Sequence, residues 1–297
     1  MLILVTGANG LVGQHLIKQL LLETDHTVAA TGKGSCRLPV LQNKRLQYHE
    51  LDITDAVNAS RFYREQRPDI IIHTAAISQA DECETGKVKC RDTNVTATRL
   101  LIEAAKEINA RFIFLSTDFV FDGEKGSYSE NELTGPVNYY GSSKLQAEKL
   151  ILQSGLKAAI VRTCLVYGNT PDAGRKNLIS WTKESLEQNK KIKVVHDQWR
   201  TPTYIDDLVK GILLLVEKKA TGIFHISGEE VMTPYDMALA TAAYLSLDNS
   251  LIEKVDASIF TQTARRPART GFNITKAKKE LGFCPISFKE ALKRMLG

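Results

Sequence analysis

Tyr140 and Lys144 are the residues whose types and spacing most clearly suggest chemistry. They are four positions apart, so a helix would place both side chains on one face. A free phenol has a pKa of about 10 and exchanges its proton reluctantly at neutral pH. A neighbouring lysine ammonium, like the positive charge of an oxidised nicotinamide, favours the phenolate and lowers that pKa. Tyr140 could therefore give a proton to a carbonyl oxygen while a hydride reaches the carbonyl carbon.

Thr117 follows an apolar run, Arg111–Ser116, that is typical of a buried strand. Strand ends are where a doubly wound sheet brings side chains to its ligand. The Thr117 hydroxyl would there hydrogen-bond the same carbonyl oxygen as Tyr140 and orient it. The competing interpretation is a surface tyrosine beside a solvated lysine. We predict that Thr117, Tyr140 and Lys144 form a catalytic set, and that the last two also contact a cofactor.

Three glycines follow the first apolar run in the segment Thr6–Gly13. A strand, a G-x-x-G-x-x-G turn and then a helix form the pattern of a dinucleotide-binding site. The first glycine allows the tight turn, the second lets a pyrophosphate approach, and the third lets helix and strand pack closely, with the helix N-terminus facing the phosphates. The alternative is a plain turn that needs glycine for its backbone angles. The predicted cofactor contacts in this turn are Gly7, Asn9, Gly10, Leu11, Val12 and Gly13.

The end of the second predicted strand, Thr27–Thr31, bears on the choice between NADH and NADPH. NADH sites usually carry an Asp or Glu there for the ribose 2′-hydroxyl, and this chain has none. Lys33 and Arg37 could instead bind a 2′-phosphate, or they are simply exposed loop cations. NADP is therefore favoured as the cofactor, and NAD stays an alternative. After a third strand, Asp52 and Ile53 could hold the adenine, although Asp52 could equally cap the following helix.

The elements that must position these residues alternate between strand and helix as far as residue 168. The predicted strands are Leu2–Thr6, Thr27–Thr31, Asp69–Ala75, Arg111–Ser116 and Ala158–Thr163. The predicted helices are Gly10–Glu23, Val57–Gln66, Thr93–Ile108 and Tyr140–Ser154. Continuously apolar strands that alternate with amphipathic helices indicate an α/β fold in which helices cover both faces of a parallel sheet. Right-handed crossovers then predict a doubly wound, Rossmann-type sheet.

This alternation breaks after Gly168. The predicted helices are Asn177–Gln188, Ile205–Glu217, Pro234–Leu245, Thr275–Leu281 and Phe288–Leu296, with strands at Ile192–His196 and Ile223–Ser227. We expect Tyr204–Ser227 to return to the main sheet. The expected organisation is a dinucleotide-binding domain of residues 1–168 plus 204–227, and a smaller substrate lobe of residues 169–203 plus 228–297.

The composition limits the function classes. The 297 residues carry 39 basic and 34 acidic side chains, a net charge of +5, and 43% of them are hydrophobic, as in average globular proteins. No apolar run approaches the ~20 residues of a membrane helix, and no basic leader of a secretory signal precedes the first strand. No basic stripe alternates with aromatic residues, which argues against nucleic acid as a partner.

The cysteines and histidines indicate neither a metal centre nor a disulfide framework. Five cysteines are scattered without a C-x-x-C pair, and six histidines are equally dispersed. This distribution predicts reduced thiols in a cytoplasmic protein. It also predicts no metal site, and it leaves a magnesium requirement open.

Several motifs together resemble the extended short-chain dehydrogenases/reductases. They are Thr6–Gly13, His73–Ala76, Ser116–Asp118 and the Tyr140–Lys144 pair. Further segments resemble the dTDP-4-dehydrorhamnose reductases within that class, over nearly the whole chain: Ser116–Gly123, Asn138–Glu148, Arg162–Gly168, Asp197–Thr203 and Arg266–Asn273.

The resemblance implies NAD(P)H-dependent reduction of the 4-keto group of a dTDP-linked deoxysugar to the L-rhamnose form. Thr117, Tyr140 and Lys144 carry over as catalytic residues, and Lys144 would also hold the nicotinamide ribose. We further expect cofactor contacts at Ala75 and Ala76. The expected substrate contacts are Thr117, Val120, Phe121, Tyr140 and Arg200. The family's usual dimer would pair the helices Thr93–Ile108 and Tyr140–Ser154, which implies a homodimer.

Two residues depart from the reductase pattern. Leu165 stands where those proteins usually have tryptophan, and Arg200 stands where they usually have glycine. An arginine there also resembles the regulatory beta subunit of methionine adenosyltransferase, which shares the fold but acts as a binding partner. Arg200 could grip a substrate phosphate or pair with an acid at the surface.

Two other functions therefore stay open beside a reductase. One is a non-catalytic NADP-binding regulatory subunit of another enzyme. The other is an epimerase or dehydratase of the same fold, although Asp118-Phe119 lacks the Asp-Glu pair typical of dehydratases.

Overall fold

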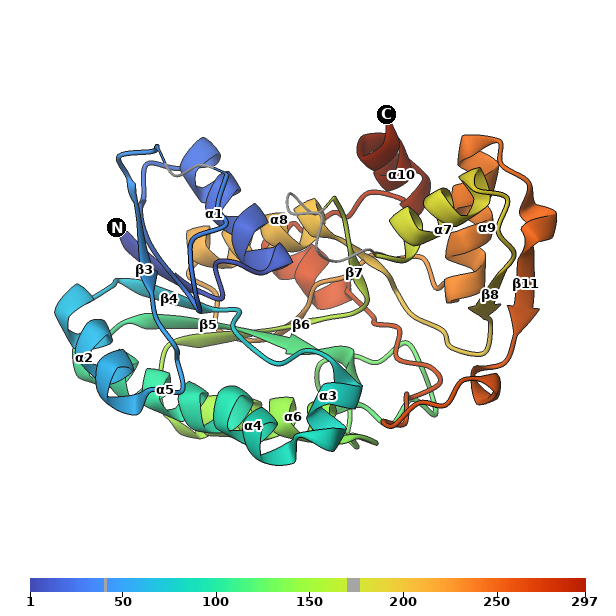
Figure 1. Cartoon of the computed structure of the whole chain (residues 1–297). Helices are drawn as coiled ribbons and strands as arrows, with labels where there is room; N and C mark the ends of the chain where they lie inside the picture. Colours follow the sequence, from blue (N-terminus) through green and yellow to red (C-terminus); the bar gives the residue numbers. More distant parts are fainter. Residues whose placement is uncertain (40–41, 170–176) are drawn as a thin grey trace.

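A computed structural model describes residues 1–39, 42–169 and 177–297 of the chain (Figure 1). Its centre is a parallel sheet of seven strands in the order β10-β6-β5-β4-β1-β2-β3. The strands are β1 (Leu2–Thr6), β2 (Thr27–Gly32), β3 (Leu46–Glu50), β4 (Ile70–His73), β5 (Arg111–Thr117), β6 (Ala158–Thr163) and β10 (Gly222–His225). The order reverses direction next to β1, which confirms the predicted doubly wound fold.

Helices cover both faces of this sheet (Figure 1). One face carries α1 (Leu11–Glu23) and α8 (Ile205–Glu217), and the other carries α2 (Ala56–Gln66), α5 (Ala97–Ile108) and α6 (Tyr139–Gln153). Successive strand residues point to opposite faces. Ile3 and Val5 therefore join the apolar core under α1 and α8, whereas Leu4 joins the core under α2, α5 and α6.

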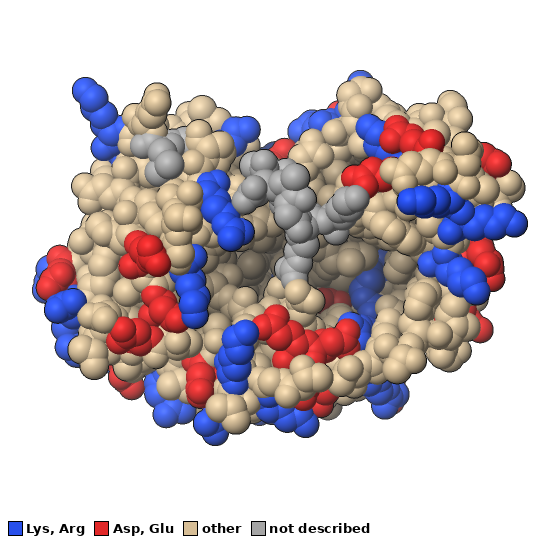
Figure 2. Space-filling view, in the orientation of Figure 1, with Lys and Arg blue, Asp and Glu red and all other residues tan. Residues whose placement is uncertain are grey.

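The remaining elements gather at one end of the sheet (Figure 1). They include α7 (Leu178–Glu187), α9 (Pro234–Leu245), α10 (Phe288–Leu296) and a parallel pair of strands, β8 (Ile192–Val195) and β11 (Ile252–Val255). A third, two-stranded sheet pairs β7 (Val166–Tyr167) with β9 (Thr203–Tyr204). The core under α1 and α8 continues into these elements through Ile179, Met237 and Phe288. Figure 2 shows a hollow on the face between them and the main sheet.

Side chains fix where the site-bearing helix begins. α6 starts one residue before its predicted bound because Asn138 accepts a hydrogen bond from the Gly141 N–H and caps the helix. The predicted helix Thr93–Ile108 is more complex: the π-helix η1 (Asp92–Thr96) leads into α5, and the short helices α3 (Ala80–Thr85) and α4 (Lys87–Arg91) precede it. The segment between β4 and α5 therefore consists of short helices instead of the start of one long helix.

Candidate active site

The glycine-rich turn between β1 and α1 has the shape that a dinucleotide needs. Gly7 has φ of +73°, and a Cβ atom there would lie 2.7 Å from the Ala75 nitrogen. A Cβ atom on Gly13 would lie 2.3 Å from the Gly7 oxygen, so that position must be glycine for α1 to pack on the turn. Gly10 is exposed and stands at the N-terminus of α1. The turn therefore offers unobstructed backbone and a positive helix end to a diphosphate.

A cavity of about 1420 Å³ opens beside this turn. Its wall includes seven of the predicted cofactor residues: Gly7, Gly10, Lys33, Asp52, Ile53, Ala75 and Ala76. The opposite wall comes from Ile77, from α3 and α4, and from η1. This volume exceeds the roughly 300–1,000 Å³ of common ligand pockets and suits a ligand as large as a dinucleotide. Asn9, Leu11, Val12, Gly13, Arg37, Tyr140 and Lys144 are not among its lining residues.

Asn9 shapes the cavity indirectly, by holding the loop that carries Lys33 and Arg37. Its side-chain nitrogen donates to the backbone oxygens of Lys33 at 3.3 Å and Ser35 at 3.0 Å. Its side-chain oxygen accepts from the Arg37 N–H at 3.0 Å. The Tyr48 hydroxyl adds a bond to the Gly34 oxygen at 2.6 Å. The loop is thus held in one shape beside the second strand.

Lys33 and Asp52 form an ion pair at the rim of the cavity, with 2.7 Å between Nζ and Oδ2. The hydrogen bond from Lys33 and those from Thr54 lower the pKa of Asp52 to about 2. The same pair raises the pKa of Lys33. Asp52 therefore stays a carboxylate at neutral pH. The Lys33 side chain is 82% exposed, so it can exchange this partner for a ligand phosphate at little cost.

Thr117 and Tyr140 meet at the carboxyl end of β5, as the sequence predicts. The Thr117 side chain lies near enough to the Tyr140 phenol to lower its pKa, and its hydroxyl donates to the Asp118 carboxylate at 3.1 Å. The Phe119 ring packs edge-on against Tyr140 with centroids 5.9 Å apart. Tyr140 is half-buried, whereas Thr117 is buried. A carbonyl oxygen next to the phenol would therefore find two hydroxyl groups side by side.

The protonation of Tyr140 differs from the sequence-based expectation. Burial raises the pKa of Tyr140 to about 12, against a smaller lowering by the Thr117 hydrogen bond. Burial also lowers the pKa of Lys144 to about 7, opposed by the charge of Glu148. The Lys144 ammonium lies 3.9 Å from the centre of the Phe114 ring. Desolvation, rather than a lysine–phenolate contact, thus dominates the site, and Tyr140 keeps its proton at neutral pH.

A buried charge network supports α6, and the sequence did not indicate it. Glu148, one turn beyond Lys144 on α6, accepts from Arg162 of β6 at 2.6 Å and from Ser116 of β5 at 2.5 Å. Glu148 and Arg162 are both buried. Glu148 and Arg162 belong to two separate sequence motifs, Asn138–Glu148 and Arg162–Gly168. Neither motif indicates that the two side chains meet. The network ties α6 to the two strands beneath it.

Arg200 does not lie in an exposed loop. Only 4% of its surface is accessible, and its guanidinium donates to the backbone oxygens of Pro267 at 2.6 Å and Ala268 at 3.1 Å. It also faces the Asp118 carboxylate at 3.6 Å. Both interpretations of the sequence, a substrate-phosphate contact and a surface ion pair, are corrected here. The donors of Arg200 are used inside the protein, where they hold residues 267–268 near the end of β5.

Val120 and Phe121 were expected to touch substrate, and the structure places both in the core. Neither has accessible surface, and the Phe121 ring stacks on Tyr128 with centroids 4.1 Å apart. A side chain without exposed surface cannot contact a ligand in this conformation. Phe119, which packs on Tyr140, is the neighbour that reaches the site.

The cysteines also correct an expectation. The structure joins Cys83 of α3 to Cys90 of α4 in a disulfide, while Cys36, Cys164 and Cys284 are free. The prediction of uniformly reduced thiols is therefore wrong, and the cytoplasmic location that it supported stays a prediction. Among the described residues, no three His, Cys, Asp or Glu side chains come together as metal ligands. In the same part of the chain every helix is too short or too polar to span a bilayer.

Comparisons with known proteins point to one family. The family model described as the RmlD substrate binding domain matches residues 1–297. The dTDP-4-dehydrorhamnose reductase of Aggregatibacter actinomycetemcomitans is 30% identical over 99% of this chain and 97% of its own length. The methionine adenosyltransferase 2 subunit beta of Mus musculus is 30% identical over 92% of this chain and 80% of its own. A solved dTDP-4-dehydrorhamnose reductase of Bacillus anthracis, in complex with NADP, superposes with a TM-score of 0.85 at 27% identity, covering 99% of this chain and 98% of that one.

Proposed function

The chain belongs to the RmlD substrate binding domain family, and we propose that it reduces the 4-keto group of a dTDP-linked deoxysugar with NADPH. The observation that carries this proposal is the pair of hydroxyl groups at the end of β5. Thr117 lies beside Tyr140 there and lowers its pKa, in a chain whose first turn is shaped for a dinucleotide. The proposal is supported by relatives that are named as reductases, one of which was solved in complex with NADP.

The residues present fit NADPH, which would supply the hydride when bound. The turn from Gly7 to Gly13 and the N-terminus of α1 would hold its diphosphate. Lys33 and Arg37 would face the 2′-phosphate, and Ile53 would pack on the adenine. Lys144 would hold the nicotinamide ribose from α6, four residues from Tyr140 on the same helix face.

Tyr140 acts as the acid of this reaction. Because its pKa is raised to about 12, the phenol carries its proton at neutral pH and can give it to the keto oxygen as negative charge develops there. The Thr117 hydroxyl donates a second hydrogen bond to the same oxygen and fixes its position. Since Tyr140 is half-buried, solvent can return the proton after turnover.

The surroundings of Asp118 favour a reductase over a dehydratase. A dehydratase needs an acid facing the sugar beside the catalytic threonine. Asp118 is buried, and its carboxylate accepts from Thr270 and faces Arg200 instead. Phe119 supplies an apolar ring at the next position. Asp118 is therefore not placed to act as a second acid, and Tyr140 is the acid of the described site, which is what a reduction requires.

A direct assay tests the proposal and its closest alternative. The protein is mixed with NADPH and either dTDP-4-dehydrorhamnose or the corresponding UDP-linked keto-sugar, and NADPH oxidation is followed. We expect oxidation with the dTDP-linked sugar and a slower reaction with the UDP-linked one. NADPH binding without oxidation of any keto-sugar would contradict the proposal and favour a regulatory subunit. The homodimer and the cytoplasmic location, expected from the sequence, are part of this proposal.

A further inference from the structure

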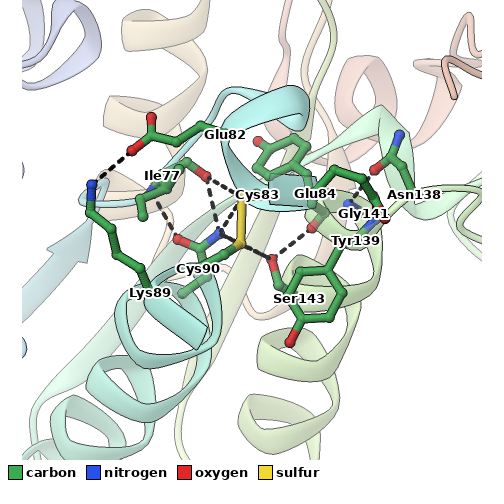
Figure 3. Close-up of a disulfide and its surroundings, with 12 residues drawn as sticks. Ile77, Glu82, Cys83, Glu84, Lys89, Cys90, Asn138, Tyr139, Gly141 and Ser143 are labelled. Atoms are coloured by element: carbon green, nitrogen blue, oxygen red, sulfur yellow. Dashed lines mark hydrogen bonds and ion pairs between the residues drawn. A yellow bond between two sulfur atoms is a disulfide. The ribbon is translucent and has the colours of Figure 1, made fainter. Parts of the chain in front are cut away.

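The disulfide between Cys83 and Cys90 joins the two ends of a segment that forms one wall of the cofactor cavity. The two Cα atoms are 5.1 Å apart, and the bond connects the last turn of α3 to α4 (Figure 3). All six residues between the cysteines, 84–89, line the cavity beside the glycine-rich turn. The bond therefore closes a small ring whose backbone is the cavity wall. A ring of this size has few conformations open to it.

The same sulfur atoms contact a side chain that links a residue of the cavity wall to α6. Asn94 of η1 lies with its nitrogen 3.4 Å from the Cys90 sulfur and 3.9 Å from the Cys83 sulfur. It exchanges two hydrogen bonds with the backbone of Ile77, a cavity residue, at 2.9 and 3.0 Å. It also donates to the Ser143 hydroxyl at 3.0 Å.

Ser143 carries this contact to the catalytic pair. It precedes Lys144 on α6, and its hydroxyl donates to the Tyr140 backbone oxygen at 2.7 Å. The Cys90 sulfur lies 3.6 Å from the same hydroxyl (Figure 3). A change in the position of the sulfur atoms therefore acts on the wall of the cavity and on the turn of α6 between Tyr140 and Lys144.

We propose that Cys83 and Cys90 are a reversible dithiol–disulfide site that sets the affinity of the chain for its nicotinamide cofactor. The inference rests on the cofactor binding of the proposed function. In the oxidation, each thiol loses its proton, the two sulfurs form one bond, and two electrons pass to a low-molecular-weight disulfide, which becomes two thiols. In the reverse step a dithiol reductant gives two electrons and two protons to the pair, the sulfur–sulfur bond breaks, and the reductant becomes a disulfide.

The burial of the pair gives the direction of the effect. Neither cysteine has accessible surface, so two separate thiols, which cannot approach as closely as bonded sulfurs, must displace their neighbours. The neighbours are Asn94 and the wall residues, and the displacement loosens the cavity. The disulfide form is thus the preorganised form and binds cofactor more tightly.

Exchange requires opening of α4, which is a helix of five residues with Val88 exposed. Such short elements open locally without unfolding the rest of a protein. Because both sulfur atoms are buried, thiol–disulfide exchange is slow. The protein therefore keeps its oxidation state during a binding measurement.

The test prepares the full-length protein in each state and counts its thiols. One sample is equilibrated with oxidised glutathione and another with dithiothreitol, and both reagents are removed. Alkylation after denaturation, followed by intact mass, should show three cysteines that carry the alkylating group or glutathione in the first sample, and five alkylated cysteines in the second. Five modified cysteines in both samples would overturn the proposal, because the bond would not form.

NADPH is then titrated into each sample, with fluorescence as the readout. We expect a Kd at least about fivefold higher for the reduced protein, the lower end of ordinary coupling between sites. The double variant Cys83→Ala, Cys90→Ala cannot form the bond, so its Kd should be the same after either treatment. Cys284→Ala, which removes an exposed free thiol, should respond as the unchanged protein does.

The outcomes separate this inference from the proposed function. Equal Kd values in samples whose thiol counts differ would overturn the redox effect and leave cofactor binding intact. Absence of NADPH binding in both samples would overturn both. The comparison within the unchanged protein needs no variant, so it decides the question even if the double variant folds poorly.

Discussion

The Arg200 guanidinium lies 3.6 Å from the Asp118 carboxylate, inside the protein. Asp118 follows Thr117 at the end of β5, and Arg200 also binds the backbone of Pro267 and Ala268. The pair thus joins the strand that ends at Thr117 to a segment far along the chain. Its role is to position that strand end.

Removal of Arg200 should therefore reduce stability. Arg200→Ala removes the positive charge that faces the buried Asp118 carboxylate and the donor to the Pro267 oxygen, and we expect the free energy of unfolding to fall by about 3–5 kcal/mol. Urea denaturation measures it. Arg269→Ala is the matched control, because Arg269 is exposed and only covers the Trp199 ring at 4.8 Å, so its loss should cost about 1 kcal/mol or less. Equal stability of Arg200→Ala and the unchanged protein would refute this role.

Acid should weaken the fold through His73. Its ring is fully enclosed between the Thr6 and Thr98 hydroxyls, at 2.7 and 3.0 Å, and burial lowers its pKa to about 3. Below pH 6.5, which is the ordinary pKa of histidine, His73 binds a proton in the unfolded chain but not in the folded chain. Stability contributed by this group therefore falls as the pH decreases from about 6.5 toward 3, with a slope of up to about 1.4 kcal/mol per pH unit.

Urea unfolding between pH 7 and pH 5, at intervals of about half a unit, checks this slope. His225, whose pKa burial likewise lowers to about 3, adds a second contribution. In the variant His73→Gln the slope should be smaller than in the unchanged protein by up to about 1.4 kcal/mol per pH unit. An identical slope in both would show that His73 does not titrate as its surroundings indicate.

Cofactor choice should depend on the loop that Asn9 holds. The double change Lys33→Ala, Arg37→Ala should raise the Kd of NADPH by about 10- to 100-fold, since a charge-assisted contact to a phosphate is worth roughly 1.5–3 kcal/mol. The Kd of NADH should hardly change. Lys44→Ala removes an exposed cation from the connection before β3 and is the control. Equal weakening of both cofactors would mean that the loop does not read the 2′-phosphate.

Tyr140→Phe should separate catalysis from binding. The change keeps the ring that packs on Phe119 and removes only the hydroxyl, so turnover should fall by about 10²- to 10⁴-fold while NADPH affinity is kept. Lys144→Ala should lose both, because Lys144 is expected to hold the ribose. Steady-state kinetics and NADPH titration of the two variants give the comparison. Full turnover in Tyr140→Phe would assign the proton to another group.

The apolar pattern was enough to predict the main sheet and its long helices, because the strands are apolar on both faces and each helix buries one apolar face. Ile205–Glu217 and Pro234–Leu245 have the predicted bounds. α3, α4 and β11 escaped prediction because they are four to six residues long and largely polar, too short for a period to appear. Their positions depend on packing against elements elsewhere in the chain.

The candidate site was predictable where its residues follow one strand or share one helix turn. Thr117 and Tyr140 meet because β5 and α6 are neighbours in the fold class that the sequence indicates. The position of Arg200 was not predictable, because its partners follow 67 and 68 residues later. The raised pKa of Tyr140 was equally hidden, since it results from burial rather than from the lysine that the motif places nearby.

Transfer of deuterium tests the central claim most directly. NADPH that carries deuterium at the transferred position of the nicotinamide is mixed with dTDP-4-dehydrorhamnose and the protein, and the sugar product is analysed by mass spectrometry. We predict a product sugar that carries the label at C4, formed by the unchanged protein and about 10²-fold or more slowly by Tyr140→Phe. An unlabelled sugar, in a sample where NADPH is demonstrably bound, would contradict the account and identify the chain as a cofactor-binding protein without reductase activity.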